Sequence, residues 1–252
     1  MSVSVEGVKK TYQSPEGEIS AVEDISLEIQ DGEFISVVGP SGCGKSTLLS
    51  IIAGLEKPSA GRVVINGEEI FGPNGEVGFM PQKDQLFPWR TIWANVTLGL
   101  EIQGKKTKER TGHVKELLER YGLGEFMKKT PGQLSGGMRQ RCALIRTLAT
   151  DPELLLLDEP FSALDYQTRL SVSDDIYTII KQEKKTAILV THDISESISM
   201  SDRVVVLTGR PSRIRSIHSL DLFSGLTPLE RRNHPEFRSY FNAIWGELDE
   251  IK

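Results

Sequence analysis

The segment GPSGCGKST at residues 39–47 constrains the fold of this chain more than any other. It follows the apolar run FISVV and opens the helical stretch TLLSIIAG. The pattern GxxxxGK[ST] is matched by Gly39, Gly44, Lys45 and Ser46. Glycines let backbone amides wrap a phosphate chain, the lysine can bridge β- and γ-phosphates, and the serine hydroxyl can hold Mg²⁺. The segment therefore predicts a strand, a phosphate-binding loop and a helix.

A second glycine-containing segment, LSGGMRQR, lies at residues 134–141 and runs into the helical stretch CALIRTLA. Ser135 is placed to cap this helix, and Gly136 and Gly137 leave its first backbone N–H groups accessible. Free N–H groups and the helix dipole converge at such a start, which favours anions. The chain thus offers two candidate phosphate sites.

Two carboxylates follow the apolar run in ELLLLDEP, residues 153–160. Asp158 is expected at the edge of a sheet, where it can reach Mg²⁺ through water. Glu159 is a candidate general base that polarises an attacking water. A solvated pair of strand-end carboxylates would explain the same letters if they stood alone. Together with the glycine loop, the pair favours ATP hydrolysis.

The hydrophobic pattern predicts an α/β fold. Period-two patterns dominate residues 2–70, and short buried strands are expected at 77–80, 154–157, 187–190 and 204–207. Strands that alternate with helices indicate a parallel sheet covered on both faces. Helical periodicity takes over at 87–150, where Val114, Leu117, Leu118 and Tyr121 share one face and Gly122 suits the end of a helix. After Gly209 we expect a strand in RIRSIHSL and a final helix at 235–250.

Composition narrows the class of protein. The 252 residues carry a formal net charge of -5, so no global basic excess points to nucleic acid. Apolar runs are too short to cross a bilayer, and the polar, alternating N-terminus does not look like a secretory signal. The two cysteines, Cys43 and Cys142, show neither a paired framework nor metal-ligand spacing. These features predict a protein of a reducing, cytoplasmic compartment.

The motifs GPSGCGKST, LSGGMRQR, LLLLDEP, SALD and ILVTHD stand in the order typical of the ATPase subunits of ABC transporters. The chain resembles that family over residues 1–208, with Met138 where the family signature LSGGQ has glutamine. The resemblance implies a P-loop NTPase fold with a parallel core sheet, an N-terminal antiparallel β subdomain and a helical subdomain inserted at about 87–150. Residues 209–252 are then a C-terminal extension.

The resemblance also implies roles for single residues. Tyr12 would stack on adenine, Gln82 would contact Mg²⁺ and the attacking water, His192 would contact the γ-phosphate, and Asp165 lies in a loop that crosses to a partner subunit. Catalysis is expected from Glu159, His192 and Gln82, and metal binding from Ser46, Gln82 and Asp158. The nucleotide is expected to contact Tyr12, Gly39, Pro40, Ser41, Gly42, Cys43, Gly44, Lys45, Ser46 and Thr47, together with Ser135, Gly136 and Gly137.

In this family two chains pack head to tail, so that the signature of each caps the γ-phosphate held by the other. The expected assembly is a homodimer that binds ATP and Mg²⁺ beneath two transmembrane permease subunits, at the cytoplasmic face of the membrane, with an external solute-binding protein acting indirectly. The segments 85–101 and 207–214 look like importers of nitrate, sulfonates, taurine and related compounds. Trp89 and Trp93 are then candidates for the permease contact or, alternatively, core residues of the helical insertion.

Two other readings remain. A soluble ABC-type ATPase that acts on nucleic acid would carry long heptad arms between Gln82 and the signature, and residues 87–134 are too short for them. A nucleotide-sensing scaffold would not need Lys45, Glu159 and His192 intact. One further prediction concerns Cys43, whose place at a helix N-terminus favours the thiolate and hence faster alkylation than at Cys142.

Overall fold

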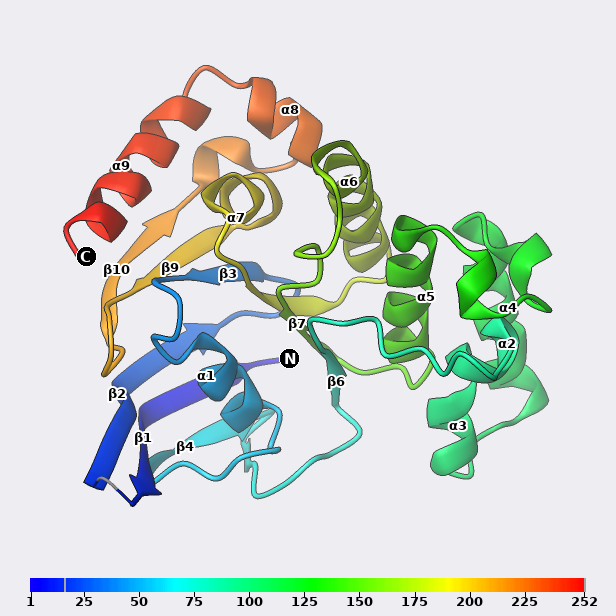
Figure 1. Cartoon of the computed structure of the whole chain (residues 1–252), viewed down its shortest axis with the longest axis horizontal. Coiled ribbons are helices and arrows are strands. Elements are labelled where there is room, and N and C mark those ends of the chain that lie inside the picture. The colour runs from blue at the N-terminus through cyan, green and yellow to red at the C-terminus, as the bar shows by residue number, and fades with distance from the viewer. Residues whose placement is uncertain (16, 252) are drawn as a thin grey trace.

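The computed structural model describes residues 1–15 and 17–251 and contains two β-sheets with helices around them (Figure 1). The strands are β1 (Val3–Ser14), β2 (Gly17–Ile29), β3 (Phe34–Val38), β4 (Ala60–Ile65), β5 (Glu68–Glu69), β6 (Val77–Met80), β7 (Leu154–Asp158), β8 (Thr186–Val190), β9 (Arg203–Leu207) and β10 (Ile214–Ser219). The α-helices are α1 (Lys45–Ile52), α2 (Ile92–Val96), α3 (Leu98–Ile102), α4 (Lys108–Arg120), α5 (Gly136–Leu148), α6 (Tyr166–Gln182), α7 (Ile194–Met200), α8 (Pro228–Asn233) and α9 (Phe237–Asp249).

The larger sheet has six strands in the order β10-β9-β3-β8-β7-β6. Only β10 pairs antiparallel to its neighbour, and the other pairings are parallel. The four short strands expected from the apolar runs all lie in this sheet. The structure confirms the predicted parallel core and places β3, which precedes the phosphate loop, between β8 and β9.

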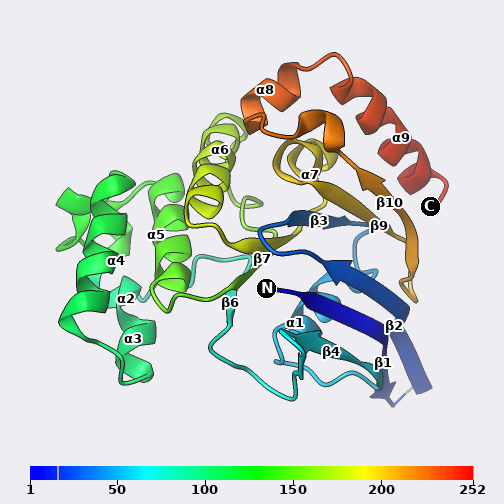
Figure 2. The same ribbon diagram turned by 180° about the vertical axis from the view of Figure 1, so that it is seen from behind.

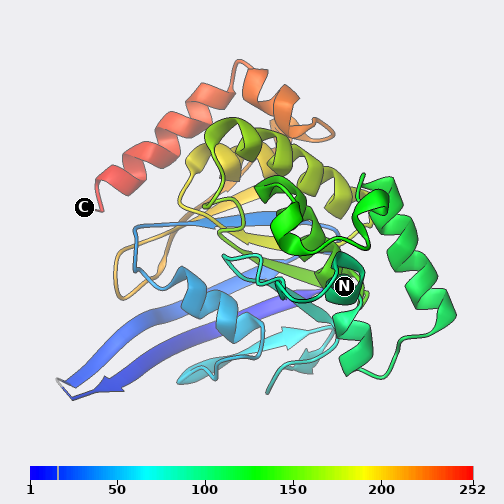
Figure 3. The ribbon, with the colours of Figure 1, turned by 45° about the vertical axis from the view of Figure 1, so that its right-hand side comes forward.

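Both faces of this sheet are buried, as parallel strands require. In β7, Leu154 and Leu156 face a core shared with α1 and the antiparallel strands. Leu155 and Leu157 face the opposite core, which α5 and α6 cover. Figure 3 shows the two layers, with α1 on one side of the sheet and α5 and α6 on the other. Because successive side chains of a strand point to opposite faces, alternate residues of β7 pack into two different cores.

The second sheet is antiparallel, with the strand order β2-β1-β4-β5. Val3, Val5 and Val8 of β1 are fully buried against the shared core, which accounts for the period-two pattern of the first 70 residues. The two sheets together confirm the α/β fold class, with an antiparallel first part and a parallel core.

Helices replace strands between β6 and β7. The buried face of α4 consists of Val114, Leu117 and Leu118, and its C-cap residue is Tyr121, immediately before Gly122. Short 3₁₀ turns at Gly124–Phe126 and Pro131–Gln133 lead from α4 to α5. Figure 2 shows α2, α3 and α4 gathered at one side of the parallel sheet, next to α5. No helix among the described residues is both long and apolar enough to span a membrane.

The C-terminal segment contains one more helix than the sequence predicts. β10 and α9 are close to the predicted strand and final helix, but α8 precedes α9. Its start is a capping box, in which Thr227 accepts from the backbone N–H of Glu230 and the Glu230 carboxylate accepts from the backbone N–H of Thr227. The letters TPLE carry this signal, with Pro228 at the first helical position.

Candidate active site

The functional residues expected from the motifs gather at one edge of the parallel sheet. The phosphate loop follows β3, Gln82 follows β6, Asp158 and Glu159 end β7, and His192 follows β8. Parallel strands present their carboxyl ends at the same edge, where ligands of open α/β sheets bind. The tertiary fold thus brings together side chains that are far apart in the sequence.

The phosphate loop has the backbone that its glycines permit. Gly44 has φ 120, and a Cβ there would lie 2.8 Å from the carbonyl oxygen of Ala21. A side chain at this position would therefore combine an unfavourable φ with a backbone clash. Lys45 is 6% exposed, and its Nζ donates to the carbonyls of Gly39 and Pro40, each at 2.9 Å. These bonds hold the ammonium group inside the loop.

Arg210 supports the phosphate loop from outside. Its Nη2 donates to the carbonyl oxygen of Gly42 at 2.8 Å, and the nearby Ser212 hydroxyl donates to the carbonyl of Ala21 at 3.1 Å. Arg210 lies in the segment 207–214, whose sequence pattern predicted no role for it. The arginine after the last core strand was the only signal, and the contact itself depends on the tertiary fold.

Ser46 and Asp158 form a pair suited to a hard cation. The Ser46 hydroxyl donates to the Asp158 carboxylate at 3.1 Å. Burial raises the pKa of Asp158, the hydrogen bond from Ser46 lowers it in part, and the charge of Glu159 raises it further. A divalent cation would relieve this cost, because oxygen donors and a desolvated carboxylate are what Mg²⁺ binds. The residues present therefore fit Mg²⁺.

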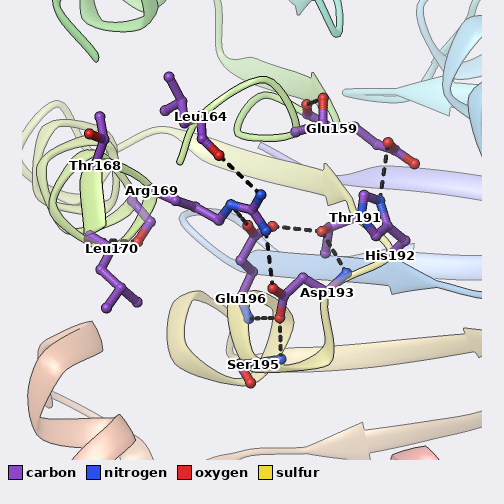
Figure 4. A network of polar contacts seen from close by, with 12 residues as sticks. Glu159, Leu164, Thr168, Arg169, Leu170, Thr191, His192, Asp193, Ser195 and Glu196 are labelled. Carbon is purple, nitrogen blue, oxygen red and sulfur yellow. Dashed lines mark hydrogen bonds and ion pairs between the residues drawn. The ribbon is translucent and has the colours of Figure 1, made fainter. Parts of the chain in front are cut away.

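Glu159 is the centre of a three-residue cluster. Its carboxylate Oε2 accepts from Gln82 Nε2 at 3.3 Å. The same oxygen lies 3.2 Å from His192 Nδ1 (Figure 4). Its backbone has φ 45, in the left-handed region that non-glycine residues seldom adopt. Such strain gathers at functional sites, where the surrounding structure imposes it. The cluster can hold a water between a base and two polar side chains.

Tyr12 lies near the phosphate loop at the end of β1. Its hydroxyl is 3.4 Å from Oγ1 of Thr47, and Lys10 Nζ lies 5.0 Å from the ring centroid. The ring is half-buried, which leaves part of it accessible for stacking. The expected adenine contact is compatible with this position and remains a prediction.

The signature segment lies at the start of α5. The Ser135 side chain accepts from the backbone N–H of Met138 at 3.3 Å, as expected for a cap. A Cβ at Gly137 would lie 2.6 Å from Val172 Cγ2, so glycine lets α5 approach α6 closely. The hydrogen bonds and ion pairs of the described residues do not join this segment to the phosphate loop, and Figure 1 shows α5 apart from α1. One chain therefore does not unite its two phosphate sites.

The predicted reactivity of Cys43 is wrong in its premise. The side chain is 2% exposed and packs in the core beside α1. Burial raises the pKa of the Cys43 thiol, and the nearby charge of Lys45 only partly opposes this. Burial also raises the pKa of Cys142, to about 12. Desolvation outweighs the helix N-terminus at Cys43, so neither thiol is activated.

The C-terminal helix reaches the edge of the sheet at which the candidate site residues gather. A cavity of about 210 Å³ lies between the phosphate loop and α9, lined by Gly39, Pro40, Ser41, His192, Ile194, Trp245, Leu248 and Asp249. Trp245 is 52% exposed. Nothing in the sequence motifs placed this helix near the nucleotide loop, because its position depends on packing against α7 and β9.

The two candidate contact tryptophans differ in burial. Trp89 is 74% exposed and its ring lies 5.1 Å from that of Phe87, whereas Trp93 packs against the core of the helical segment. The segment after Gln82 is tied to α5, because Arg146 donates to the backbone carbonyls of Asp84 and Gln85 at 2.8 and 2.7 Å. The core interpretation thus holds for Trp93, and Trp89 is left on the surface.

The fold and the clustered motifs define a P-loop nucleotide-binding protein of the ATPase class. Comparison with known proteins identifies the family. The protein-family model described as ABC transporter matches residues 22–162 of this chain. The chain belongs to the ATP-binding subunits of ABC transporters and is an ATPase.

Relatives match nearly the whole chain. An uncharacterized ABC transporter ATP-binding protein, YtlC of Bacillus subtilis, is 48% identical over 98% of this chain and 96% of its own length. The aliphatic sulfonates import ATP-binding protein SsuB of Bacillus licheniformis is 41% identical, with 99% and 95% covered. The taurine import ATP-binding protein TauB of Roseobacter denitrificans is 38% identical, with 99% and 96% covered.

Among solved structures, the chain resembles a dimeric post-hydrolysis state of the ATP-binding cassette MJ0796 bound to ADP and Pi. The TM-score is 0.71 at 32% identity, and the match covers 86% of this chain and 98% of that one. The likeness supports ATP as the bound nucleotide and the dimer as the assembly of this family.

Proposed function

We propose that this chain is the ATP-hydrolysing subunit of an importer, and that the cluster at the sheet edge is its catalytic site. The observation that carries the proposal is the convergence of Gln82 and His192 on the carboxylate of Glu159, at 3.3 and 3.2 Å. This cluster lies at the same edge of the sheet as Asp158, which ends β7, and the phosphate loop that follows β3 and leads to Lys45. A base, its polar neighbours and a phosphate loop are the parts that hydrolysis of a γ-phosphate needs.

In the proposed reaction, Lys45 and the backbone N–H groups of residues 39–47 bind the phosphate chain. Glu159 accepts a proton from the attacking water, and Gln82 and His192 orient that water and the γ-phosphate. Ser46, Asp158 and Gln82 would hold Mg²⁺, which neutralises charge on the phosphates when bound. The water oxygen bonds to the γ-phosphorus as the bond between that phosphorus and the β–γ bridging oxygen breaks. ADP leaves with the bridging oxygen, and inorganic phosphate is released.

Completion of the site requires a second copy of the chain. The Ser135 to Gly137 segment is remote from the chain's own phosphate loop, and a relative of this family is dimeric. We therefore place the signature of each chain on the γ-phosphate held by its partner. Binding of ATP would then close the dimer, and hydrolysis would reopen it.

The names of two relatives support import of a small solute, because one relative is named as an aliphatic sulfonates import protein and the other as a taurine import protein. We propose two permease subunits as membrane partners, with Trp89 at the contact, and an external solute-binding protein that acts indirectly. This places the chain at the cytoplasmic face of the membrane. The proposed solute class is nitrate, sulfonates, taurine or a related organic compound.

The test is growth of the source organism after deletion of the gene. Taurine, an alkanesulfonate or nitrate would be supplied in turn as the sole source of sulfur or nitrogen. We expect one of these to fail to support growth, with rescue by the wild-type gene and not by Glu159→Gln. Normal growth of the deletion strain on all of them would reject the proposed solute class. Rescue of growth by Glu159→Gln would show that uptake does not depend on hydrolysis through Glu159.

A further inference from the structure

Arg169, in the first turn of α6, lies between the loops that carry Glu159 and His192. Its Nη2 donates to the carbonyl of Leu164 at 3.1 Å, in the loop that follows Glu159 (Figure 4). Its other contacts reach the segment after β8, with Nη1 3.5 Å from Asp193 Oδ2 and Nε 3.7 Å from Glu196 Oε1. One guanidinium group thus joins both catalytic loops.

The residues on either side of His192 are fixed through this network. Thr191 donates its hydroxyl proton to Glu196 Oε2 at 2.6 Å and accepts from the backbone N–H of Asp193 at 3.0 Å. Asp193 Oδ1 accepts from the backbone N–H groups of Ser195 and Glu196 at 2.8 and 3.1 Å. The direction of the His192 side chain therefore depends on contacts that Arg169 shares.

The contacts form a closed circuit. Arg169 ties the Leu164 carbonyl to Asp193 and Glu196, these hold the flanks of His192, and the His192 ring meets the Glu159 carboxylate. Glu159 begins the loop that leads back to Leu164. A change at Arg169 would therefore alter the relative position of His192 and Glu159 without touching the nucleotide itself.

Arg169 differs from an arginine that only stabilises the fold. Arg231 is 1% exposed and spends its donors on the carbonyls of Leu226 and Ser201 and the hydroxyl of Tyr177. In Arg169 the Nε atom is buried and has no hydrogen-bond partner among the described residues. Its contact with Glu196 Oε1 at 3.7 Å is an ion pair beyond hydrogen-bond distance. A buried donor without a hydrogen bond calls for an explanation, and a functional constraint is one that native proteins accept.

We propose that Arg169 is a positioning residue for hydrolysis: it sets the geometry between His192 and Glu159 by clamping the two loops that carry them. This inference rests on the proposed roles of those two residues. It predicts an effect on the chemical step and none on nucleotide binding, because Lys45, Tyr12 and the phosphate loop lie outside the network.

The test compares Arg169→Met with Arg203→Met in the full-length chain. Arg203 is a matched control, since its side chain is 26% exposed against 23% for Arg169. Arg203 begins β9 and pairs with Glu33, which directly precedes β3, so this ion pair lies at the end of the sheet opposite the proposed site. For Arg169→Met we expect kcat to fall about tenfold to a hundredfold, as for other small displacements of catalytic groups, with KM and nucleotide affinity within about twofold. Arg203→Met is expected to lower Tm and leave kcat unchanged.

A second arm asks whether Arg169 acts through His192. In a His192→Ala background, Arg169→Met should lower kcat no further, because the group it positions is gone. Thr191→Val cuts both Thr191 contacts and should lower kcat in the same way, which keeps the test valid if Arg169→Met does not fold. Full additivity with His192→Ala, or normal kcat in folded Arg169→Met, would overturn the proposal. Normal turnover in both Glu159→Gln and His192→Ala would instead reject the proposed site.

Discussion

The imidazole Nδ1 of His192 lies 3.2 Å from the carboxylate Oε2 of Glu159, although 33 positions separate them in the chain. β7 and β8 are adjacent parallel strands, so their carboxyl ends meet at one edge. The contact gives Glu159 a partner that can orient its carboxylate before substrate binds.

Replacing Glu159 with glutamine is expected to lower ATP turnover by about a hundredfold or more, because the amide cannot take a proton from water. Nucleotide binding should persist, and Mg-ATP should trap a closed dimer on gel filtration. Glu183→Gln is the control, since Glu183 pairs with Arg120 outside the site and its side chain is 14% exposed against 22% for Glu159. Normal hydrolysis in Glu159→Gln would remove Glu159 from the proposed role.

Removal of the Tyr12 ring should weaken nucleotide affinity by about 1 kcal/mol, in the range expected for a stack between an aromatic ring and a base. The measurement is equilibrium binding of a fluorescent ATP analogue to Tyr12→Ala. Tyr12→Phe separates the ring from the hydroxyl that lies 3.4 Å from Thr47 Oγ1. We expect Phe to bind like Tyr. An unchanged affinity in the alanine variant would return Tyr12 to a packing role.

Glu196 should make stability depend on pH. Burial raises its pKa from the usual 4.5 to about 7, the hydrogen bond from Thr191 opposes this, Asp193 adds to it, and Arg169 and His192 oppose it. Glu196 lines a cavity together with Asp193, Arg169 and, from α8, Arg232. The folded state therefore binds the proton of the Glu196 carboxyl group more tightly than the unfolded state does. The stabilisation that this proton gives to the folded state is complete below about pH 4.5 and is lost as pH rises through 7.

Glu196→Gln removes this titration while its amide oxygen can still accept from Thr191. The free energy of unfolding of the variant relative to wild type should therefore rise between pH 5 and pH 8, by up to about 3 kcal/mol. Urea unfolding at several pH values measures the difference. A difference that does not change with pH would show that Glu196 ionises normally in the folded protein.

Mixed dimers test whether the two phosphate sites are shared. Lys45→Ala disables the loop of one chain, and Ser135→Asp places a repelling carboxylate at the signature of the other while keeping a capping residue. Ser135 is exposed, whereas a side chain at Gly137 would clash with Val172. Random mixing restores at most about a quarter of the sites, since about half of the dimers are mixed and each has one intact site.

Photocrosslinking of an ATP analogue to the closed dimer should be absent for each variant alone and reappear on mixing. Subunit exchange must be shown separately, by mass or by a fluorescent label. If the subunits exchange and no ATP-closed dimer forms in the mixture, the signature of one chain does not serve the loop of the other.

Local patterns in the sequence determined the elements and the chemistry that they carry. The strand before GPSGCGKST, the cap at Ser135 and the carboxylates that end β7 depend on neighbours within a few residues, so spacing alone identified them. The parallel core followed for the same reason, because short apolar runs such as LLLL at 154–157 that alternate with helical stretches are typical of strands buried on both faces.

Contacts between distant segments were decided only by the tertiary structure. Arg169 on α6 contacts Asp193, which follows β8, and Arg210 donates to the carbonyl of Gly42. The helix α9 lies beside the phosphate loop. No local pattern in the sequence predicts any of these three contacts. The local pattern at Cys43 gave a wrong prediction. Its position at a helix start suggested a reactive thiol, whereas its burial in the folded chain raises the pKa of that thiol. Burial and long-range pairing depend on how layers pack, and a short stretch of sequence does not encode that packing.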